Sequence, residues 1–187
     1  PALFMSNRQP ETRYLLIPRV SSENRIYIPI GYLEPEIIIS DRVTALPNAN
    51  QYIFGIITSL MHMSWMRVTC GRLKSDYNYS NQIVYNNYPF PKEVPEKKKE
   101  AVEAAAQAVL DIRKIYTDKG NSLADLYDPN TMPPDLLKAH QTLDKAVDKC
   151  YRDAPFTSEA KRIEFLFELY EKYTANLFTV VKKRGKK

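Results

Sequence analysis

The sequence predicts an α+β fold in which an irregular β-rich domain surrounds one buried helix and a small helical bundle follows. Three observations lead to this prediction. Short β-branched and aromatic runs fill the first part of the chain, a helix-length apolar stretch follows them, and helix formers with charged residues dominate the second half. The 187 residues are 44% hydrophobic and include only 5 glycines, which favours packed structure over disorder.

Turn-forming residues separate the runs that we expect to be strands. The strands are predicted at residues 13–20, 25–30, 36–40 and 42–46, with a hairpin loop at residues 21–24. Pro18 and Pro29 lie inside two of these runs, and each removes a backbone hydrogen-bond donor. We therefore expect edge or bulged strands in a small, irregular sheet.

One long helix is expected over residues 51–69, with Asn48 or Asn50 as its N-cap. Apolar side chains cover nearly its whole circumference, which is typical of a helix that is buried on all sides. We expect this helix to pass behind the sheet. A last short strand is expected at residues 83–85.

A change of composition near residue 95 predicts a β-rich domain of residues 1–95 and a helical domain of residues 96–187. Three amphipathic helices are expected in the second domain: residues 96–116, residues 135–151, and a third that begins at Thr157 or Ser158 and carries Leu177 and Phe178 on its apolar face. Amphipathic helices with short links favour a small bundle.

Global charge carries little information about a partner. The net charge is +5, but residues 182–187 hold five of the cations, so the rest of the chain is nearly neutral. Polar residues interrupt the longest apolar run, residues 52–66, which argues against a membrane span. Because the chain opens at Pro1 without an initiator methionine, we expect it to be part of a longer protein.

No pattern of catalytic, cofactor-binding or metal-binding residues is found in the sequence. His62 and His140 are the only histidines, and neither has a second ligand at metal-binding spacing, so we expect them in a core or on a helix surface. Cys70 and Cys150 are far apart, which predicts reduced, buried thiols of a cytoplasmic protein. We expect this chain alone to be catalytically silent.

Residues 67–91 carry the strongest functional signal. Arg67, Arg72 and Lys74 precede a run in which tyrosines alternate with asparagines. Cations suit phosphates, amides suit base edges and flat rings pack against sugars, so this inventory is typical of a nucleic-acid surface. A polar loop that packs a few tyrosines explains the composition equally well.

Lys74 and Asp76 sharpen the nucleic-acid interpretation. They are two residues apart, and such residues point to the same face of a strand. A lysine donates to guanine O6 and N7, whereas an aspartate accepts from cytosine N4. We therefore predict that the two residues read the two halves of one G·C pair.

Three long runs carry a family resemblance that extends over almost the whole chain: RYLLIPRVSSENRIYIPIGYL, IFGIITSLMHMSWMRVTCGRLKSDYNYSNQIVYNNYPFP and LADLYDPNTMPPDLLKAHQTLDKAVDKCY. They resemble the C-terminal part of MmeI-like DNA adenine methyltransferases, which are large bacterial restriction-modification enzymes. The resemblance implies that the first domain belongs to a target recognition domain. It also implies that the S-adenosylmethionine fold and any nuclease domain precede this region, so no cofactor is expected in this chain.

The resemblance implies roles for single residues. Its GR-L/M-x-S-x-Y-x-Y-S stretch has variable positions, associated with target choice, that correspond to Lys74, Asp76 and Asn78. Residues that match the fixed part are implied to position the DNA backbone, and we expect the neighbouring Asn81 to do the same: Gly71, Arg72, Ser75, Tyr77, Tyr79, Ser80 and Asn81.

Asn78 departs from the family pattern, because many relatives resemble DYRYS with an arginine there. Arg42 stands where relatives often carry a small residue. One hypothesis is that Arg42 reads guanine with Asn78 assisting, or that Asn78 reads adenine directly. The alternative is that Arg42 is an exposed turn residue.

These expectations combine into DNA sequence recognition for a site-specific DNA adenine N6-methyltransferase, with or without endonuclease activity elsewhere in the parent. The expected partners are double-stranded DNA and the methyltransferase domain of the same parent chain, which flips the target base into its pocket. Two other classes stay open. One is an RNA-binding module whose tyrosines stack on unpaired bases, and the other is a helical protein-interaction domain.

Overall fold

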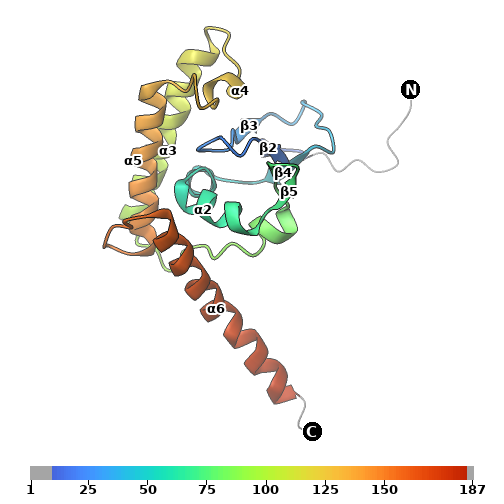
Figure 1. The fold of residues 1–187 in the computed structure, drawn as a ribbon, viewed down its shortest axis with the longest axis vertical. Helices are drawn as coiled ribbons and strands as arrows, with labels where there is room; N and C mark the ends of the chain where they lie inside the picture. The colour runs from blue at the N-terminus through green and yellow to red at the C-terminus, as the bar shows by residue number, and fades with distance from the viewer. Residues whose placement is uncertain (1–9, 185–187) are drawn as a thin grey trace, which may run out of the picture.

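The computed structural model describes residues 10–184, and for residues 176–184 only the backbone (Figure 1). Leu177, Phe178 and the cations of residues 182–187 therefore lie outside the described side chains. Small antiparallel sheets occupy the first half of the chain and long helices the second, so the predicted α+β fold class is confirmed. No helix within residues 10–184 is long and apolar enough to cross a membrane.

The chain forms two three-stranded antiparallel sheets. The first has the strand order β3 (Gly31–Leu33), β1 (Tyr14–Pro18), β4 (Val43–Pro47). The second has the order β2 (Val20–Ser21), β6 (Asp76–Asn78), β5 (Gly71–Leu73). Arg19 alone separates β1 from β2. The chain therefore passes from one sheet to the other at this residue.

Two of the predicted strands, residues 25–30 and 36–40, are wrong, and so is the hairpin that was predicted between residues 13–20 and 25–30. Residues 25–30 form no strand, although Tyr27, Ile28 and Ile30 are all buried. Arginine side chains, and not a neighbouring strand, supply hydrogen-bond donors to backbone carbonyls of this segment. Arg67 donates to the carbonyl of Ile26 at 2.9 Å, and Arg113 donates to the carbonyl of Ile30 at 2.6 Å. Residues 36–40 form a loop.

The predicted strand at residues 83–85 is also wrong, since these residues belong to a π-helical turn, η1 (Asn81–Tyr85). The side chain of Asn87 donates to the carbonyls of Gln82 and Ile83 at 2.8 and 3.0 Å. Those two acceptors therefore bond within the turn instead of joining a sheet ladder.

The apolar helix is buried as predicted, but it is broken into α1 (Gln51–Ile57) and α2 (Leu60–Thr69). At the break, the Thr58 hydroxyl donates to the carbonyl of Phe54 at 2.6 Å and the Ser59 hydroxyl donates to that of Ile56 at 2.7 Å. Asn50 caps α1, as one of the two predicted candidates, by accepting from the Ile53 N–H at 2.9 Å.

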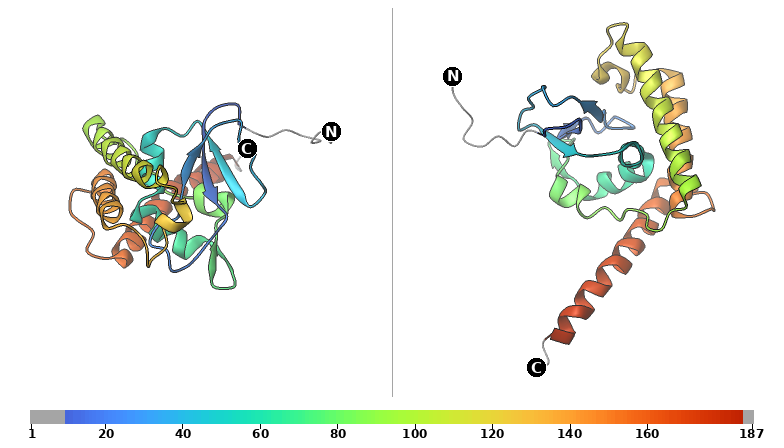
Figure 2. Two further views of the ribbon diagram at one scale, coloured as in Figure 1. Left: turned by 90° about the horizontal axis from the view of Figure 1, so that it is seen from above. Right: turned by 180° about the vertical axis from the view of Figure 1, so that it is seen from behind.

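Four helices make up the second half of the chain: α3 (Glu96–Thr117), α4 (Leu123–Leu126), α5 (Pro134–Tyr151) and α6 (Glu159–Arg184). Helices α3 and α5 lie side by side in both views (Figures 1 and 2). Helix α1 approaches α3 closely at Gly55, where a Cβ would lie 2.6 Å from Val102. Glycine is required at this crossing.

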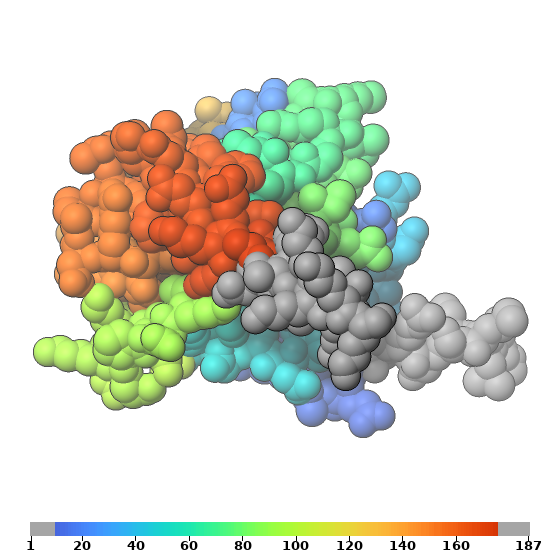
Figure 3. Space-filling model, turned by 90° about the horizontal axis from the view of Figure 1, so that it is seen from below, coloured from blue at the N-terminus to red at the C-terminus, as the bar shows by residue number. Residues whose placement is uncertain are grey.

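Helix α6 packs against α2 and then extends away from the rest of the molecule (Figure 1). The space-filling view shows its first turns against both α5 and the α2 region (Figure 3). Arg67 of α2 joins the start of α6 through an ion pair with Glu159 at 2.8 Å. One hydrophobic core runs through both halves of the described chain, so the division at residue 95 stays a prediction.

Candidate nucleic-acid interface

Strands β5 and β6 form a hairpin with Lys74 and Ser75 at its tip. Along β6 the side chains alternate, since Asp76 and Asn78 are partly exposed whereas Tyr77 and Tyr79 are buried. Across the hairpin, Gly71 lies opposite Asn78 and Leu73 opposite Asp76. Opposite residues share a face. We name the face that holds these four the outer face of the hairpin: Gly71, Leu73, Asp76 and Asn78.

Lys74 does not lie in a strand, so the argument that placed it on one strand face with Asp76 is wrong. It occupies the hairpin turn with a φ of 57°, a left-handed conformation that few non-glycine residues adopt. Its side chain is exposed at the tip, and Asp76 lies at the start of the outer face. The residues that share a strand face are Asp76 and Asn78.

The inner face of the hairpin belongs to the core. Tyr77 is 5% and Tyr79 1% exposed, and the Tyr79 hydroxyl lies 3.0 Å from Nε2 of His62. Burial raises the pKa of Tyr79 and lowers the pKa of His62 to about 3, so both groups are neutral at physiological pH. Direct contact of these two tyrosine rings with DNA, as the sequence suggested, is therefore excluded in this conformation.

The three cations of the stretch do not form one cluster. Arg67 is tied to Glu159 and to the Ile26 carbonyl. Arg72 lies across from Tyr77, with its guanidinium 4.4 Å from the centre of that ring, and donates to the Ser75 carbonyl at 2.9 Å. It therefore lies on the opposite side of the hairpin from Asn78. Arg67 is a structural residue.

Arg42 lies in the turn before β4 and is exposed. Its carbonyl accepts from the backbone N–H of Arg19 at 3.1 Å, and the carbonyl of Arg19 accepts from the N–H of Tyr79 at 2.6 Å. Arg19 therefore lies between Arg42 and the end of β6, so the fold brings Arg42 and Asn78 to either side of one residue.

Arg19 was missed by the sequence argument. Its side chain is exposed and donates to the carbonyl of Asp41 at 3.1 Å. The sequence did contain a signal for Arg19. Proline cannot donate a backbone hydrogen bond to a strand ladder, and Arg19 directly follows Pro18, the last residue of β1.

The remaining predicted residues lie around the hairpin. Ser75 is exposed at the tip, Ser80 is half-buried before η1, and Asn81 is exposed as the first residue of η1. None of the three lies on the outer face.

The base-reading candidates have free hydrogen-bonding groups. Among the described residues, the side chains of Lys74, Asp76, Asn78 and Arg42 have no intramolecular hydrogen-bond or ion-pair partner: the only bonds at these residues involve their backbone atoms. An ammonium, a carboxylate, a carboxamide and a guanidinium are thus available to a ligand, which is the donor and acceptor set that the major groove requires.

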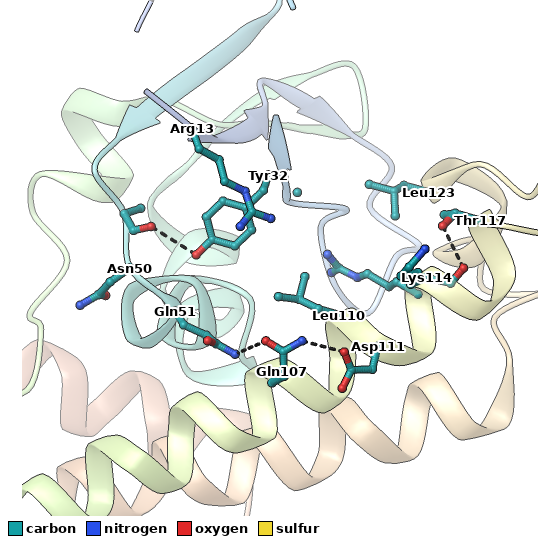
Figure 4. Close-up of a pocket in the computed structure, with 13 residues that line it drawn as sticks. Arg13, Tyr32, Asn50, Gln51, Gln107, Leu110, Asp111, Lys114, Thr117 and Leu123 are labelled. Atoms are coloured by element: carbon teal, nitrogen blue, oxygen red, sulfur yellow. Dashed lines mark hydrogen bonds between the residues drawn. The ribbon is translucent and has the colours of Figure 1, made fainter. Parts of the chain in front are cut away.

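A cleft of about 620 Å³ lies between α3, the start of α1 and the first sheet (Figure 4). Its polar side chains bond to one another, because Gln51 donates to Gln107 at 2.8 Å and Gln107 donates to Asp111 at 2.6 Å. No group of three or more histidine, cysteine or acidic residues in the described chain is arranged to hold a metal.

The two cysteines are free in the structure. Both Cys70 and Cys150 are only half-buried, so the prediction that they are buried is corrected. Burial raises the pKa of each thiol, which keeps it protonated.

Comparison with known proteins identifies the family. Residues 1–92 match the model of the MmeI target recognition domain, and residues 94–178 match that of the MmeI C-terminal domain. DNA methyltransferase A of Bacillus subtilis (strain 168) is 39% identical over 174 residues, which are 93% of this chain and 19% of that protein. The chain thus spans about a fifth of this relative.

A solved structure agrees with the fold. The Type IIL restriction-modification enzyme MmeI in complex with DNA superimposes with a TM-score of 0.86 and 49% identity, over 92% of this chain and 23% of that chain. The two domain models are adjacent and together span nearly all residues. The chain therefore belongs to the MmeI family, of which it comprises the target recognition and C-terminal domains.

Proposed function

We propose that this chain reads the target sequence of a restriction-modification enzyme by placing the tip and outer face of the β5–β6 hairpin against double-stranded DNA. The observation that carries the proposal is the set of four polar side chains that have no bonding partner within the described part of the chain: Arg42, Lys74, Asp76 and Asn78. The complex of the MmeI relative with DNA supports the choice of ligand.

A two-stranded β-ribbon fits the major groove, where each base pair shows a distinct set of donors and acceptors. Asp76 accepts from cytosine N4, and Lys74 reaches the guanine of the same pair from the hairpin tip. The turn conformation of Lys74 replaces the strand alternation that the sequence suggested, and it leaves the ammonium free to approach the neighbouring base.

Arg42 and Asn78 read a second base pair under this proposal. Their placement on either side of Arg19 supports a shared target. Either Arg42 reads guanine with Asn78 assisting, or Asn78 reads adenine through its carboxamide. Combining Arg42→Ala with Asn78→Arg should change one position of the modified sequence, and an unchanged sequence excludes this pair of roles.

Phosphate contacts come from the flanks of the hairpin. Arg72, Ser75, Ser80 and Asn81 surround the outer face without lying on it, which suits residues that position the DNA backbone. The tyrosines contribute by holding β6 against α2 through their buried rings.

The parent enzyme supplies the chemistry. A bacterial, cytoplasmic adenine N6-methyltransferase uses S-adenosylmethionine and a base flipped out of the duplex, and its methyltransferase domain forms the other wall of the DNA cleft. The name of the curated relative, a DNA methyltransferase, supports this assignment.

An RNA-binding module loses its main support in the structure. That interpretation required exposed tyrosines on which unpaired bases stack. Tyr77, Tyr79 and Tyr88 are at most 5% exposed and offer no stacking platform, and only Tyr85 of the run is partly exposed.

The test exchanges the charges of the first pair in the full-length parent enzyme. N6-methyladenine is mapped in the DNA of a host that expresses either the wild type or the Lys74→Glu, Asp76→Arg double variant. We expect one G·C position of the methylated motif to become C·G while the other positions persist. The matched control reverses Lys161 and Glu164, an exposed ion pair on α6, and should leave the motif unchanged.

Two results contradict the proposal in different ways. If the double variant methylates the original motif, Lys74 and Asp76 do not read bases. If the wild type methylates no defined motif, the chain is not part of an active adenine methyltransferase.

A further inference from the structure

Gly71 begins β5 and faces Asn78 across the hairpin. Nothing in its backbone requires glycine, since Gly120 is the only glycine with a positive φ among the described residues. Nothing in its packing requires glycine either. A Cβ at residue 71 would lie 3.7 Å from the Asn78 carbonyl oxygen and 3.9 Å from the Asn78 Cβ, which are ordinary contact distances.

Glycine is a poor choice for this position as far as the fold is concerned. It weakens a strand, because the unfolded chain loses more conformational freedom and no side chain packs across to the partner strand. The contrast with Gly55 is informative, since a Cβ there would collide with Val102 at 2.6 Å. Gly55 is explained by packing, whereas Gly71 is not.

The surroundings of Gly71 indicate what the absence of a side chain at this position allows. It is exposed, and its missing Cβ would stand 4.0 Å from the Asn78 Nδ2 atom on the outer face. A carboxamide that reads a base needs the base edge at about 2.9 Å from its nitrogen. A side chain at residue 71 would therefore compete for the space that such a base edge occupies.

We propose that Gly71 is a specificity-determining position, whose bare backbone lets the edge of a DNA base pair reach the carboxamide of Asn78. The inference rests on the proposed function and deepens it. A close approach of backbone to a ligand is one of the situations in which only glycine serves. The effect grows with side-chain size, because each added atom fills more of the space beside Asn78.

The experiment uses the full-length parent enzyme with Gly71→Ala and Gly71→Val, and with Arg72→Ala as the contrast on the other side of the hairpin. The methylated motif is mapped by sequencing, affinity is measured with duplex DNA that contains the wild-type motif, and thermal unfolding is followed in parallel. We expect Gly71→Val to weaken the affinity on the order of tenfold to a hundredfold and to relax the motif at one position, the position that Asn78 substitutions change.

Gly71→Ala should show the same change to a smaller extent, with an unfolding temperature equal to or above that of the wild type. Arg72→Ala should weaken binding to all sequences alike and leave the motif intact. The alanine variant controls for loss of folding, because a Cβ at residue 71 would lie no closer than 3.7 Å to the nearest atoms and should not disturb the fold.

An unchanged motif and affinity in both Gly71 variants overturns the inference alone. A loss of binding that is equal for all sequences also overturns it, because blocked access to one base pair affects one position. A wild-type parent that modifies no defined motif overturns the proposed function and the inference together.

Discussion

The helical half of the molecule and the β5–β6 hairpin differ in whether their polar side chains are bonded within the protein. In the helical half, four polar or ionisable side chains are buried and hydrogen-bonded to the protein: Arg113, His140, Asp144 and Asp148 are at most 8% exposed. Within the described chain, Nη2 of Arg113 and Nδ1 of His140 have no partner. At the hairpin and the turn beside it, the side chains of Lys74, Asp76 and Arg42 have no such bonds within the described chain.

The difference separates two uses of polarity. A buried charge costs free energy unless a partner compensates it, so each group in the helical half stabilises one particular packing. An exposed group without a partner contributes little to folding and keeps its hydrogen-bonding capacity for a ligand. Substitutions in the first region should therefore change stability, and those in the second should change recognition.

The largest effect on stability is expected from Asp148→Ala. Asp148 accepts from Nε and Nη2 of Arg162 at 3.0 and 2.6 Å, and its loss leaves that largely buried guanidinium without this carboxylate. We expect a loss of about 3 kcal/mol in the free energy of unfolding, measured by chemical denaturation. Glu164→Ala, which breaks the exposed pair on the same helix, is the control and should change little. Equal effects of the two variants would remove the distinction between the regions.

Asp144 should make stability depend on pH. Its carboxylate accepts from the N–H of Leu60 and the hydroxyl of Tyr27, both at 2.7 Å, and burial raises its pKa from 3.8 to about 6. Because the folded state then binds the proton more tightly than the unfolded state, stability falls as pH rises from about 4 to about 6.

Asp144→Asn removes this titration: its amide oxygen can still accept from the Leu60 N–H, and its amide nitrogen can donate to the Tyr27 hydroxyl oxygen, which reverses the direction of that hydrogen bond. Above pH 6 we expect the variant to be more stable than the wild type by up to about 3 kcal/mol, and near pH 4 we expect the two to converge. Thermal unfolding across this range measures the gap. A gap that is constant with pH would show that Asp144 does not titrate there.

Tyr79→Phe tests the inner face of the hairpin. It removes the hydroxyl that bonds to Nε2 of the buried His62, so we expect a loss of about 1 kcal/mol in stability without any change of methylated motif. Tyr77→Phe is the matched variant and should cost less, since its hydroxyl makes a longer bond of 3.3 Å to the Glu23 carbonyl. A changed motif in either variant would mean that the inner face takes part in reading.

Lys74→Gly should change stability in the opposite direction, by a small amount. Its left-handed φ of 57° suits glycine, so the variant should gain up to about 1 kcal/mol while the motif relaxes at one G·C position. Glu93→Gly is the control, because Glu93 has a φ of 54° and lies away from the outer face. It should stabilise the fold and leave the motif unchanged. Destabilisation by Lys74→Gly would indicate that its side chain supports the turn.

The local sequence pattern predicted structure correctly where a single physical effect, such as burial of an apolar helix face, decides the outcome. The periodicity of residues 96–116 and 135–151 placed α3 and α5 to within a residue at each end, since an amphipathic stripe has one favourable way to be buried. Residues 67–91 could also be chosen as a candidate interface, because the hydrogen-bond donors and acceptors of side chains follow directly from the residue types. The strand predicted at residues 25–30 is wrong because a β-like pattern does not show whether a partner strand is present. In the structure, arginine side chains bond to the carbonyls of this segment instead.

The sequence by itself determined the fold class, the buried character of α1 and α2, and the residue types offered to DNA, because these depend on composition and short-range spacing. Only the tertiary structure decided which of those residues share a surface. Lys74 lies in a turn instead of a strand, Arg67 is paired with Glu159, and Tyr77 and Tyr79 are buried. Arg19 lies between Arg42 and β6. Such outcomes depend on contacts between residues far apart in the chain, and no local pattern specifies them.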